Sequence, residues 1–329
     1  MRFVAFLAAF SAFAESPYAG SAACAACHRT QFVTQPKTPM GKALERAADC
    51  EILRAHPRLA FKEGAYATTI SREGDKSFYS VTDGANTIRV PLEWAFGLGV
   101  AGQTYVLQYQ GEWYESRVSF YNETGALDLT MGAAGYRPHS VEEAFGRKMS
   151  QCDQHDCFAC HATGSADVAK LTPGVQCENC HGPAASHVAT HTSMPKLAKL
   201  SAEEMSEACG RCHRTWSQIA LDGPRDIRNV RFQPYRLTNS KCYDSSDARI
   251  SCAACHDPHR DVETKSSAYD AKCAACHNAT STQRAAKLCK VAKQDCSSCH
   301  MPKLELPGAH HKFTDHNIRI VRDHEPYPS

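Results

Sequence analysis

The sequence predicts an α+β protein made mainly of short helices and loops, with an antiparallel β-meander inserted near the N-terminus. Two observations support this prediction. The pattern Cys-x-x-Cys-His occurs seven times, once near the N-terminus and six times between residues 157 and 300. The interval between the first two copies instead alternates β-branched and aromatic residues with polar ones, which is typical of half-buried strands. We therefore expect one region organised by the repeated motif and one organised by a β-sheet.

The repeated motif indicates covalent attachment of haem c. Two thiols three positions apart can bond the two vinyl groups of one porphyrin, and the adjacent His then lies beneath the iron as proximal ligand. Random placement of the 18 Cys and 17 His would give roughly 0.05 copies, so seven copies are not accidental. A structural zinc site is the alternative, but zinc sites rarely place a His directly after the second Cys each time.

We therefore expect seven haems, so that the helical part is wrapped around seven c-type haems. The attachment residues are Cys24, Cys27, Cys157, Cys160, Cys177, Cys180, Cys209, Cys212, Cys252, Cys255, Cys273, Cys276, Cys296 and Cys299. The proximal ligands are His28, His161, His181, His213, His256, His277 and His300.

Residues 1–14 are expected to form a signal peptide. Met1 and Arg2 precede an apolar stretch that ends in an Ala-x-Ala cleavage site and is too short to span a bilayer. No later apolar run approaches membrane length, so we expect no integral membrane segment. The mature protein is expected to be exported, either periplasmic or extracellular. Export suits c-type haems, which are attached outside the cytoplasm, and it permits disulfides.

Three segments are expected after the signal peptide. Residues 15–58 carry the first motif, residues 59–135 form the β-meander, and residues 136–329 form a helical domain with six motifs. Porphyrins would supply much of the apolar interior of this last segment. Haem-free polypeptide from it should therefore fold poorly.

Within these segments, turn-forming Gly and Asp residues separate five runs of strand character. The strands are expected at residues 66–70, 77–81, 87–90, 104–109 and 113–121. Helical stretches are expected at residues 141–149 and 201–209. Ser201 and Glu204 match a capping box at the start of the second stretch.

Four cysteines lie outside the motifs: Cys50, Cys152, Cys242 and Cys289. Four cysteines allow three pairings. We expect Cys242–Cys289, which would join the last three motifs, and Cys50–Cys152, which would close the segment before the second motif. Free buried thiols are the alternative. A reactive thiol is less favoured, because no activating base lies beside these residues.

Ten further histidines are available as sixth ligands of the irons. His187 and His259 are the strongest candidates, because a Pro turn separates each from the preceding motif His and should direct it to a neighbouring haem. The full set of expected distal ligands is His139, His155, His187, His259, His310 (or His311) and His316. The histidines expected to remain unligated are His56, His191 and His324. Surface histidine is the alternative for every candidate.

The charge balance disfavours a nucleic-acid partner. The polypeptide has a formal charge of +2, but the propionates of seven haems would add roughly 14 negative charges if all ionise. The Lys/Arg-rich stretch at residues 225–236 is expected to be a solvated loop that meets propionates. We expect the partners to be other redox proteins that donate and accept electrons.

Three of the repeats extend into longer motifs. They are Cys-His-Gly-Pro-x-x-x-His at residues 180–187, Cys-His-Asp-Pro-His at 255–259, and Cys-His-Met-Pro-Lys at 299–303 followed by Thr-Asp-His at 314–316. With the early motif and the β insertion, this ordered set resembles multihaem c-type cytochromes related to pentahaem nitrite reductase and hydroxylamine oxidoreductase. The resemblance implies haems packed in close pairs.

Relatives in that superfamily often carry a distal His about a dozen residues after the first motif, where this chain has Met40. Ligation by Met40 would favour ferrous iron and raise the potential of the first haem above that of haems with two His ligands. The alternative is that Met40 packs against the porphyrin without binding iron.

The sequence favours electron transfer over catalysis. Nitrite reductases of this superfamily usually mark the catalytic haem with Cys-x-x-Cys-Lys, a motif that this chain lacks. The spare histidines and Met40 suffice for every iron, so no open haem is required. The alternatives are an oxidoreductase acting on a small nitrogen or sulfur compound at one open haem, and a subunit of an extracellular cytochrome filament. The histidine surplus near the C-terminus would permit such a homo-oligomer.

Overall fold

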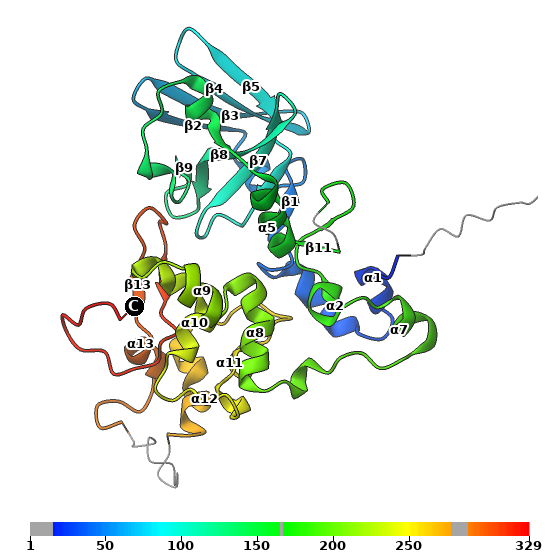
Figure 1. Ribbon diagram of the computed structural model, residues 1–329, viewed down its shortest axis with the longest axis vertical. Coiled ribbons are helices and arrows are strands. Elements are labelled where there is room, and N and C mark those ends of the chain that lie inside the picture. The colour runs from blue at the N-terminus through cyan, green and yellow to red at the C-terminus, as the bar shows by residue number, and fades with distance from the viewer. Residues whose placement is uncertain (1–15, 165–166, 278–288, 329) are drawn as a thin grey trace, which may run out of the picture.

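The computed structural model describes residues 16–164, 167–277 and 289–328. A β-rich part and a part built of short helices lie at opposite ends of the molecule in Figure 1. The expected signal peptide, residues 1–14, lies outside the described residues.

The first sheet of the β-rich part is a four-stranded antiparallel meander. Its strands follow one another in space as they do in sequence: β2 (Arg58–Glu63), β3 (Tyr66–Glu73), β4 (Lys76–Thr82) and β5 (Thr87–Pro91). Alternate residues of β4 point inward, so Tyr79 and Val81 are fully buried while their neighbours are not. Tyr79 lies opposite Ile70 of β3 and Val81 lies opposite Ile88 of β5, which fixes the register of the apolar face.

The second sheet brings together strands from both sides of the predicted meander. Its strands are β1 (Leu44–Arg46), β6 (Trp94–Phe96), β7 (Gln103–Tyr109), β8 (Glu112–Tyr121), β9 (Ala126–Leu129) and β10 (Gly146–Lys148). They run in the order β1-β6-β7-β8-β10, with β9 also paired to β8. The expectation of one meander is therefore wrong in its pairing. All five predicted strands are present, but three belong to the first sheet and two to the second.

The two sheets form a β-sandwich around one hydrophobic core. Leu59, Ile70 and Val81 from the first sheet meet Leu107 and Val118 from the second in a single buried cluster. Helix α4 (Val141–Phe145) closes this core, and the Tyr79 hydroxyl donates a hydrogen bond to the carbonyl of its last residue (3.0 Å). The helix predicted at 141–149 ends early, because the chain turns at Gly146 into β10.

The other elements are short helices and two small hairpins. Before β2 they are α1 (Ser21–Cys24), α2 (Arg29–Thr34), η1 (Gln35–Lys37) and α3 (Glu51–Ala55), and η2 (Ala133–Gly135) precedes α4. After β10 they are α5 (Gln151–His161), β11 (Ala162–Thr163), β12 (Thr172–Pro173), α6 (Cys177–His181), α7 (Ala185–Thr190), η3 (Leu197–Lys199), α8 (Ala202–His213), α9 (Trp216–Asp222), η4 (Ile227–Arg231), α10 (Gln233–Thr238), η5 (Ala248–Ile250), α11 (Cys252–Cys255), η6 (Ser266–Tyr269), α12 (Asp270–Ala274), α13 (Cys296–His300), β13 (Lys303–Glu305) and β14 (Lys312–Thr314).

Capping determines where two of the motif helices begin. The predicted box at Ser201 and Glu204 is confirmed: the Glu204 amide donates to the Ser201 hydroxyl (3.2 Å) and the Ser201 amide donates to the Glu204 carboxylate (2.8 Å). Ser150 and Asp153 form the same box at the start of α5. Both helices end on the His of a motif.

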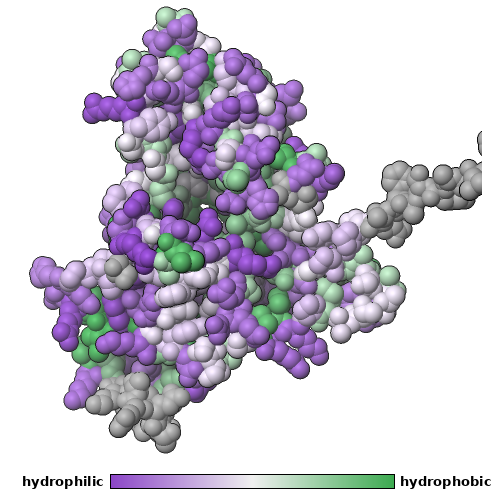
Figure 2. All heavy atoms as spheres, in the orientation of Figure 1, coloured by the Kyte–Doolittle hydropathy of each residue, from purple (hydrophilic) through white to green (hydrophobic). Residues whose placement is uncertain are grey.

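The helical part has little hydrophobic core made of side chains. Both buried clusters draw their fully buried members from residues 44–162, which are the sandwich and α5. After residue 162, the buried apolar side chains are Ala184, Ala202, Ile219, Val230, Tyr235, Leu237, Leu306 and Ala309. Figure 2 shows a mostly hydrophilic surface over this part, with small apolar patches. The described side chains of this part therefore bury much less apolar surface than those of the β-rich part.

A buried ion pair holds the C-terminal segment onto α10. The Arg236 guanidinium donates to both carboxylate oxygens of Asp315 (2.8 and 3.0 Å), and both side chains are essentially inaccessible to solvent. Arg319 adds a third charged hydrogen bond to Asp315 (2.7 Å). The expectation of a solvated loop at residues 225–236 is therefore wrong: most of the stretch forms η4 and α10, and Arg236 lies in the interior because it pairs with Asp315.

Neither expected disulfide is formed. The Cys50 thiol is buried and donates to the Gln103 side chain (3.2 Å), whereas Cys152 is exposed on α5. Cys242 and Cys289 are also free. Cys50 is held by the packing of the sandwich, so the alternative of a buried free thiol describes it better.

Candidate haem-binding sites

Each Cys-x-x-Cys-His motif folds as one helical turn. In the first, fifth and sixth motifs, the His amide donates to the carbonyl of the first Cys at 2.8, 2.9 and 2.9 Å. The other four motifs lie in α5, α6, α8 and α13, each of which ends on the motif His. Residues spaced by three and four share one face of a helix, so both thiols and the imidazole of a motif face the same way. This is the arrangement that one porphyrin requires.

Several imidazoles use Nδ1 for a backbone hydrogen bond. His161 bonds the Ala43 carbonyl (2.9 Å) and His300 bonds the Arg319 carbonyl (2.8 Å). The candidate distal ligands His316 and His187 do the same with the carbonyls of Thr314 (2.9 Å) and Thr192 (2.5 Å). A proton held on Nδ1 leaves Nε2 with a free lone pair, and metal-binding histidines are commonly oriented in this way.

Two motif histidines each face a histidine from another part of the chain. The ring centroids of His181 and His259 are 6.1 Å apart with planes at 15°, and those of His256 and His316 are 6.2 Å apart with planes at 49°. A metal–imidazole bond is about 2 Å long and the ring centre lies about 1 Å further, so two imidazoles on opposite sides of one metal ion have centroids about 6 Å apart. Both separations leave room for one iron between the rings. His259 thus lies against the third motif and not against its own.

Burial favours the neutral, metal-binding form of five motif and candidate-ligand imidazoles. Desolvation lowers the pKa of His316 to about 4, with smaller effects from neighbouring groups. Desolvation also lowers the pKa of His161, His181, His213 and His256. A neutral imidazole is the ligand form at neutral pH.

Several motif residues are accessible to solvent and yet deeply surrounded by protein. Cys180 and Cys255 are exposed, but desolvation raises the pKa of both thiols. His213 also has exposed surface, although desolvation lowers its pKa. This combination is compatible with side chains that would surround a large apolar group. With the sparse side-chain core, this supports haem as the filling of the helical part.

The motifs lie against one another in an order that differs from the sequence. The thiols of four pairs lie near enough to influence each other's pKa: Cys24–Cys177, Cys160–Cys212, Cys209–Cys252 and Cys273–Cys296. Cys180 with Cys209 and Cys255 with Cys273 are close enough to interact electrostatically. The contacts connect the first motif to the third, and then the fourth, fifth, sixth and seventh in turn. The second motif joins the fourth.

The remaining candidate ligands are placed differently. His139 and His155 are exposed, and His155 contacts the Asp156 carboxylate (3.5 Å). The Met40 carbonyl accepts from the Val175 amide (2.9 Å), which places Met40 beside the segment that leads into the third motif. The proximal candidates His28 and His277 are both exposed.

His310 makes a contact that its sequence context does not suggest. Its Nε2 bonds the Asp128 carboxylate (2.7 Å) and its ring packs on Tyr121, with centroids 4.6 Å apart. These contacts join the C-terminal hairpin to the β-sandwich. The Nε2 atom of His310 is thus engaged, whereas the adjacent His311 packs against Phe313.

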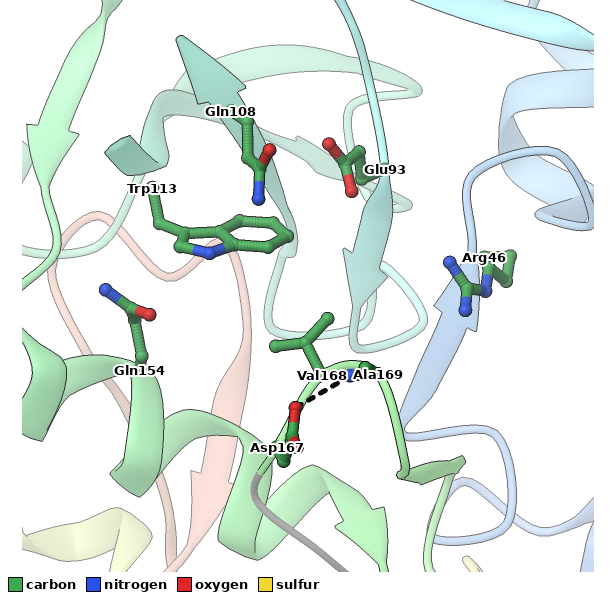
Figure 3. Close-up of a pocket in the computed structure, with 8 residues that line it drawn as sticks. All are labelled: Arg46, Glu93, Gln108, Trp113, Gln154, Asp167, Val168 and Ala169. Carbon is green, nitrogen blue, oxygen red and sulfur yellow. Dashed lines mark hydrogen bonds between the residues drawn. The ribbon is translucent and has the colours of Figure 1, made fainter. Parts of the chain in front are cut away.

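Two cavities differ in their relation to the motifs. A cavity of about 280 Å³ is lined by Cys255, His256, Asp257, Arg260, Asp261, Val262, Glu263 and Tyr269, so it adjoins the fifth motif. A larger hollow of about 540 Å³ is lined by Arg46, Glu93, Gln108, Trp113, Gln154, Asp167, Val168 and Ala169. Figure 3 shows Trp113 and Gln108 projecting from neighbouring strands towards this hollow, opposite Gln154 of α5. Its lining is mainly polar and includes none of the motif residues.

Sequence reasoning missed two side chains that contact the imidazoles. Asp257 accepts from the His259 ring (3.1 Å), and the Tyr269 hydroxyl lies 3.5 Å from Nδ1 of His256. Asp257 stands inside the Cys-His-Asp-Pro-His motif and could have been found there. Tyr269 carries no signal in the sequence, because only the fold brings it to His256.

Comparison with known proteins supports the interpretation from the residues. No protein-family model matches the chain. Over 192 residues it is 25% identical to "Multiheme cytochrome MtrA" of Shewanella baltica (strain OS185). This aligned region covers 50% of this chain and 52% of that protein. This similarity supports a multihaem c-type cytochrome. The chain spans about half the length of this curated relative.

The fold also has a counterpart among solved structures. The crystal structure of the outer cell wall cytochrome OcwA superposes with a TM-score of 0.54 at 14% identity, covering 93% of this chain and 80% of that one. At this identity the match shows a shared fold. Within the described part of the chain, none of the helices combines the length and apolar character needed to cross a bilayer.

Proposed function

We propose that this chain is a heptahaem c-type cytochrome that transfers electrons in the periplasm or outside the cell. Seven Cys-x-x-Cys-His motifs supply the attachment sites, and the described residues of the helical part form no buried cluster like those of residues 44–162. Bound haem would supply one-electron chemistry, and the chain would attach, ligate and space the haems.

The observation that carries this proposal is the pairing of imidazoles at the separation of two ligands on one iron. His259 is the proposed distal ligand of the haem attached at Cys177 and Cys180. His316 is the proposed distal ligand of the haem attached at Cys252 and Cys255. An iron bound on both sides has no free position for a substrate, so such haems carry electrons and do not bind small molecules.

The contacts between motifs support a continuous path for electrons. Thiols of two motifs that lie near each other would bring the edges of their two porphyrins close together. The contacts run from the first motif through the third to the seventh, and the second motif adds a branch at the fourth. Redox proteins that dock at the ends of this array would be the donor and the acceptor.

Electron paramagnetic resonance of the oxidised holoprotein tests the proposal. We expect low-spin signals from every haem in the wild type. His259→Ala and His316→Ala should each convert one haem in seven to high spin, because each removes one axial ligand. His191→Asn is the matched control: His191 has a left-handed backbone (φ 55°) that Asn tolerates, and it should leave every signal unchanged.

A high-spin signal from one haem in the wild type would contradict the proposal and favour an oxidoreductase with an open haem. Unchanged spectra in both alanine variants would show that the pairing is wrong. Mass spectrometry of the exported protein gives an independent check, since it should find seven added tetrapyrroles.

A further inference from the structure

The motif and candidate-ligand imidazoles differ in the group that accepts the proton on Nδ1. His161, His187, His300 and His316 all bond a neutral backbone carbonyl. His259 bonds a carboxylate instead: its Nδ1 lies 3.1 Å from Oδ1 of Asp257. Among the imidazoles facing a motif His, His259 alone has this contact in the described residues.

The local backbone fixes the Asp257 carboxylate in this position. The same Oδ1 atom accepts the backbone amide of His259 (3.0 Å), which closes a turn around Pro258. Arg260 approaches the other carboxylate oxygen at 3.5 Å. Two hydrogen bonds to one oxygen hold the acceptor in line with the imidazole, so the contact does not depend on a freely rotating side chain.

An anionic acceptor makes an imidazole a stronger electron donor to its metal. When Nδ1–H bonds a carboxylate, negative charge is shared with the ring and the ligand becomes more basic. A more basic axial ligand stabilises ferric iron relative to ferrous iron. The reduction potential of that haem is thereby lowered.

We propose that Asp257 lowers the reduction potential of the haem attached at Cys177 and Cys180 through its hydrogen bond to His259. This inference rests on the proposed pairing of His259 with His181. Asp257 acts through His259 and is a positioning residue. The haem it controls stands between the first and fourth motifs in the contact order, so it forms an uphill step for electrons that pass between them.

Redox titration monitored by paramagnetic resonance tests this role in the intact holoprotein. Asp257→Asn keeps the size and the acceptor oxygen but removes the charge. We expect the midpoint potential of one low-spin signal to rise, and that signal should be the one lost in His259→Ala. The control is Asp261→Asn, which removes a nearby acid lining the same cavity without a contact to His259 and should leave that midpoint unchanged.

Three results would overturn the inference. An unchanged midpoint in Asp257→Asn, with the signal still lost in His259→Ala, would refute the role of Asp257 and leave the electron-transfer function intact. An equal rise in Asp261→Asn would show a general effect of charge in place of a hydrogen bond. Retention of all low-spin signals in His259→Ala would refute the pairing of His259 with His181, and with it this inference, while leaving the electron-transfer function in place.

Discussion

Removing the Asp315 carboxylate should open the C-terminal segment that carries His316. Asp315 accepts two hydrogen bonds from Arg236, one from Arg319 and one from the Asn317 amide. In Asp315→Ala, the buried Arg236 keeps only its bonds to the Asn229 side chain and the Pro328 carbonyl. Its charge then has no counterion in the interior.

The expected cost follows from the burial of the pair. Breaking a buried ion pair by removing one partner destabilises by about 3–5 kcal/mol, because the other charge stays desolvated. Each 1.4 kcal/mol is tenfold in an equilibrium constant, so local opening should become roughly 100- to 4,000-fold more populated. Amide hydrogen exchange of peptides covering residues 312–320 in the holoprotein measures this opening.

Two further variants separate the ion pair from other effects. Asp323→Ala removes an exposed acid near the end of the same segment and should leave exchange unchanged. Adding Arg236→Met to Asp315→Ala should slow the exchange again, because no unpaired charge remains buried. Wild-type exchange rates in Asp315→Ala would refute the assigned role of the pair.

Three further predictions concern stability. Gly174→Ala should destabilise the protein by about 1–3 kcal/mol, because Gly174 has φ +75° and an added Cβ would lie 2.0 Å from the Gly41 carbonyl oxygen. Gly182 also has a positive φ (+82°) but open space around it, so Gly182→Ala should show a smaller loss of stability in thermal unfolding. Asp153 has its pKa held at about 2 by hydrogen bonds from Ser150 and Arg147, so its folded pKa is below its unfolded value. Its cap should stabilise fully above about pH 4 and be lost as pH falls towards 2, where the melting temperatures of wild type and Asp153→Asn should converge. Haem-free polypeptide should keep a protease-resistant fragment spanning residues 44–162, because that region has its own core, while residues 167–328 are digested. Mass spectrometry of the digest identifies the surviving fragment.

The sequence predicts those parts of the fold that have a repeating local pattern. The long strands β3, β4, β5, β7 and β8 alternate over five or more residues and are all present. The three-residue strands β1 and β10 are too short for any period and form only because β6 and β8 offer free edges. Division into two sheets also escaped prediction, because pairing depends on long-range contacts.

The candidate sites likewise combine local patterns, which the sequence predicts, with long-range contacts, which it does not. The motifs are local, and each folds as the single helical turn that its spacing implies. The partner of each imidazole is not local. His310 stands in a histidine-rich segment that suggests ligation, yet its Nε2 meets Asp128 on β9, far earlier in the chain. The Pro turns near His187 and His259 are equally local signals, but only His259 is brought against a motif His.

The two parts of the molecule gain stability from different sources, and this explains why the distal histidines come from late in the chain. The sandwich closes its own core, so it needs neither haem nor the C-terminal segment. The helical part has no such core, and its cross-links would be iron bonds that join His181 to His259 and His256 to His316. A bond between distant residues reduces the entropy of the unfolded chain in the way that a disulfide does. The ion pair of Arg236 with Asp315 holds the residue next to His316 in place, so it lowers the entropic cost of closing the loop between His256 and His316.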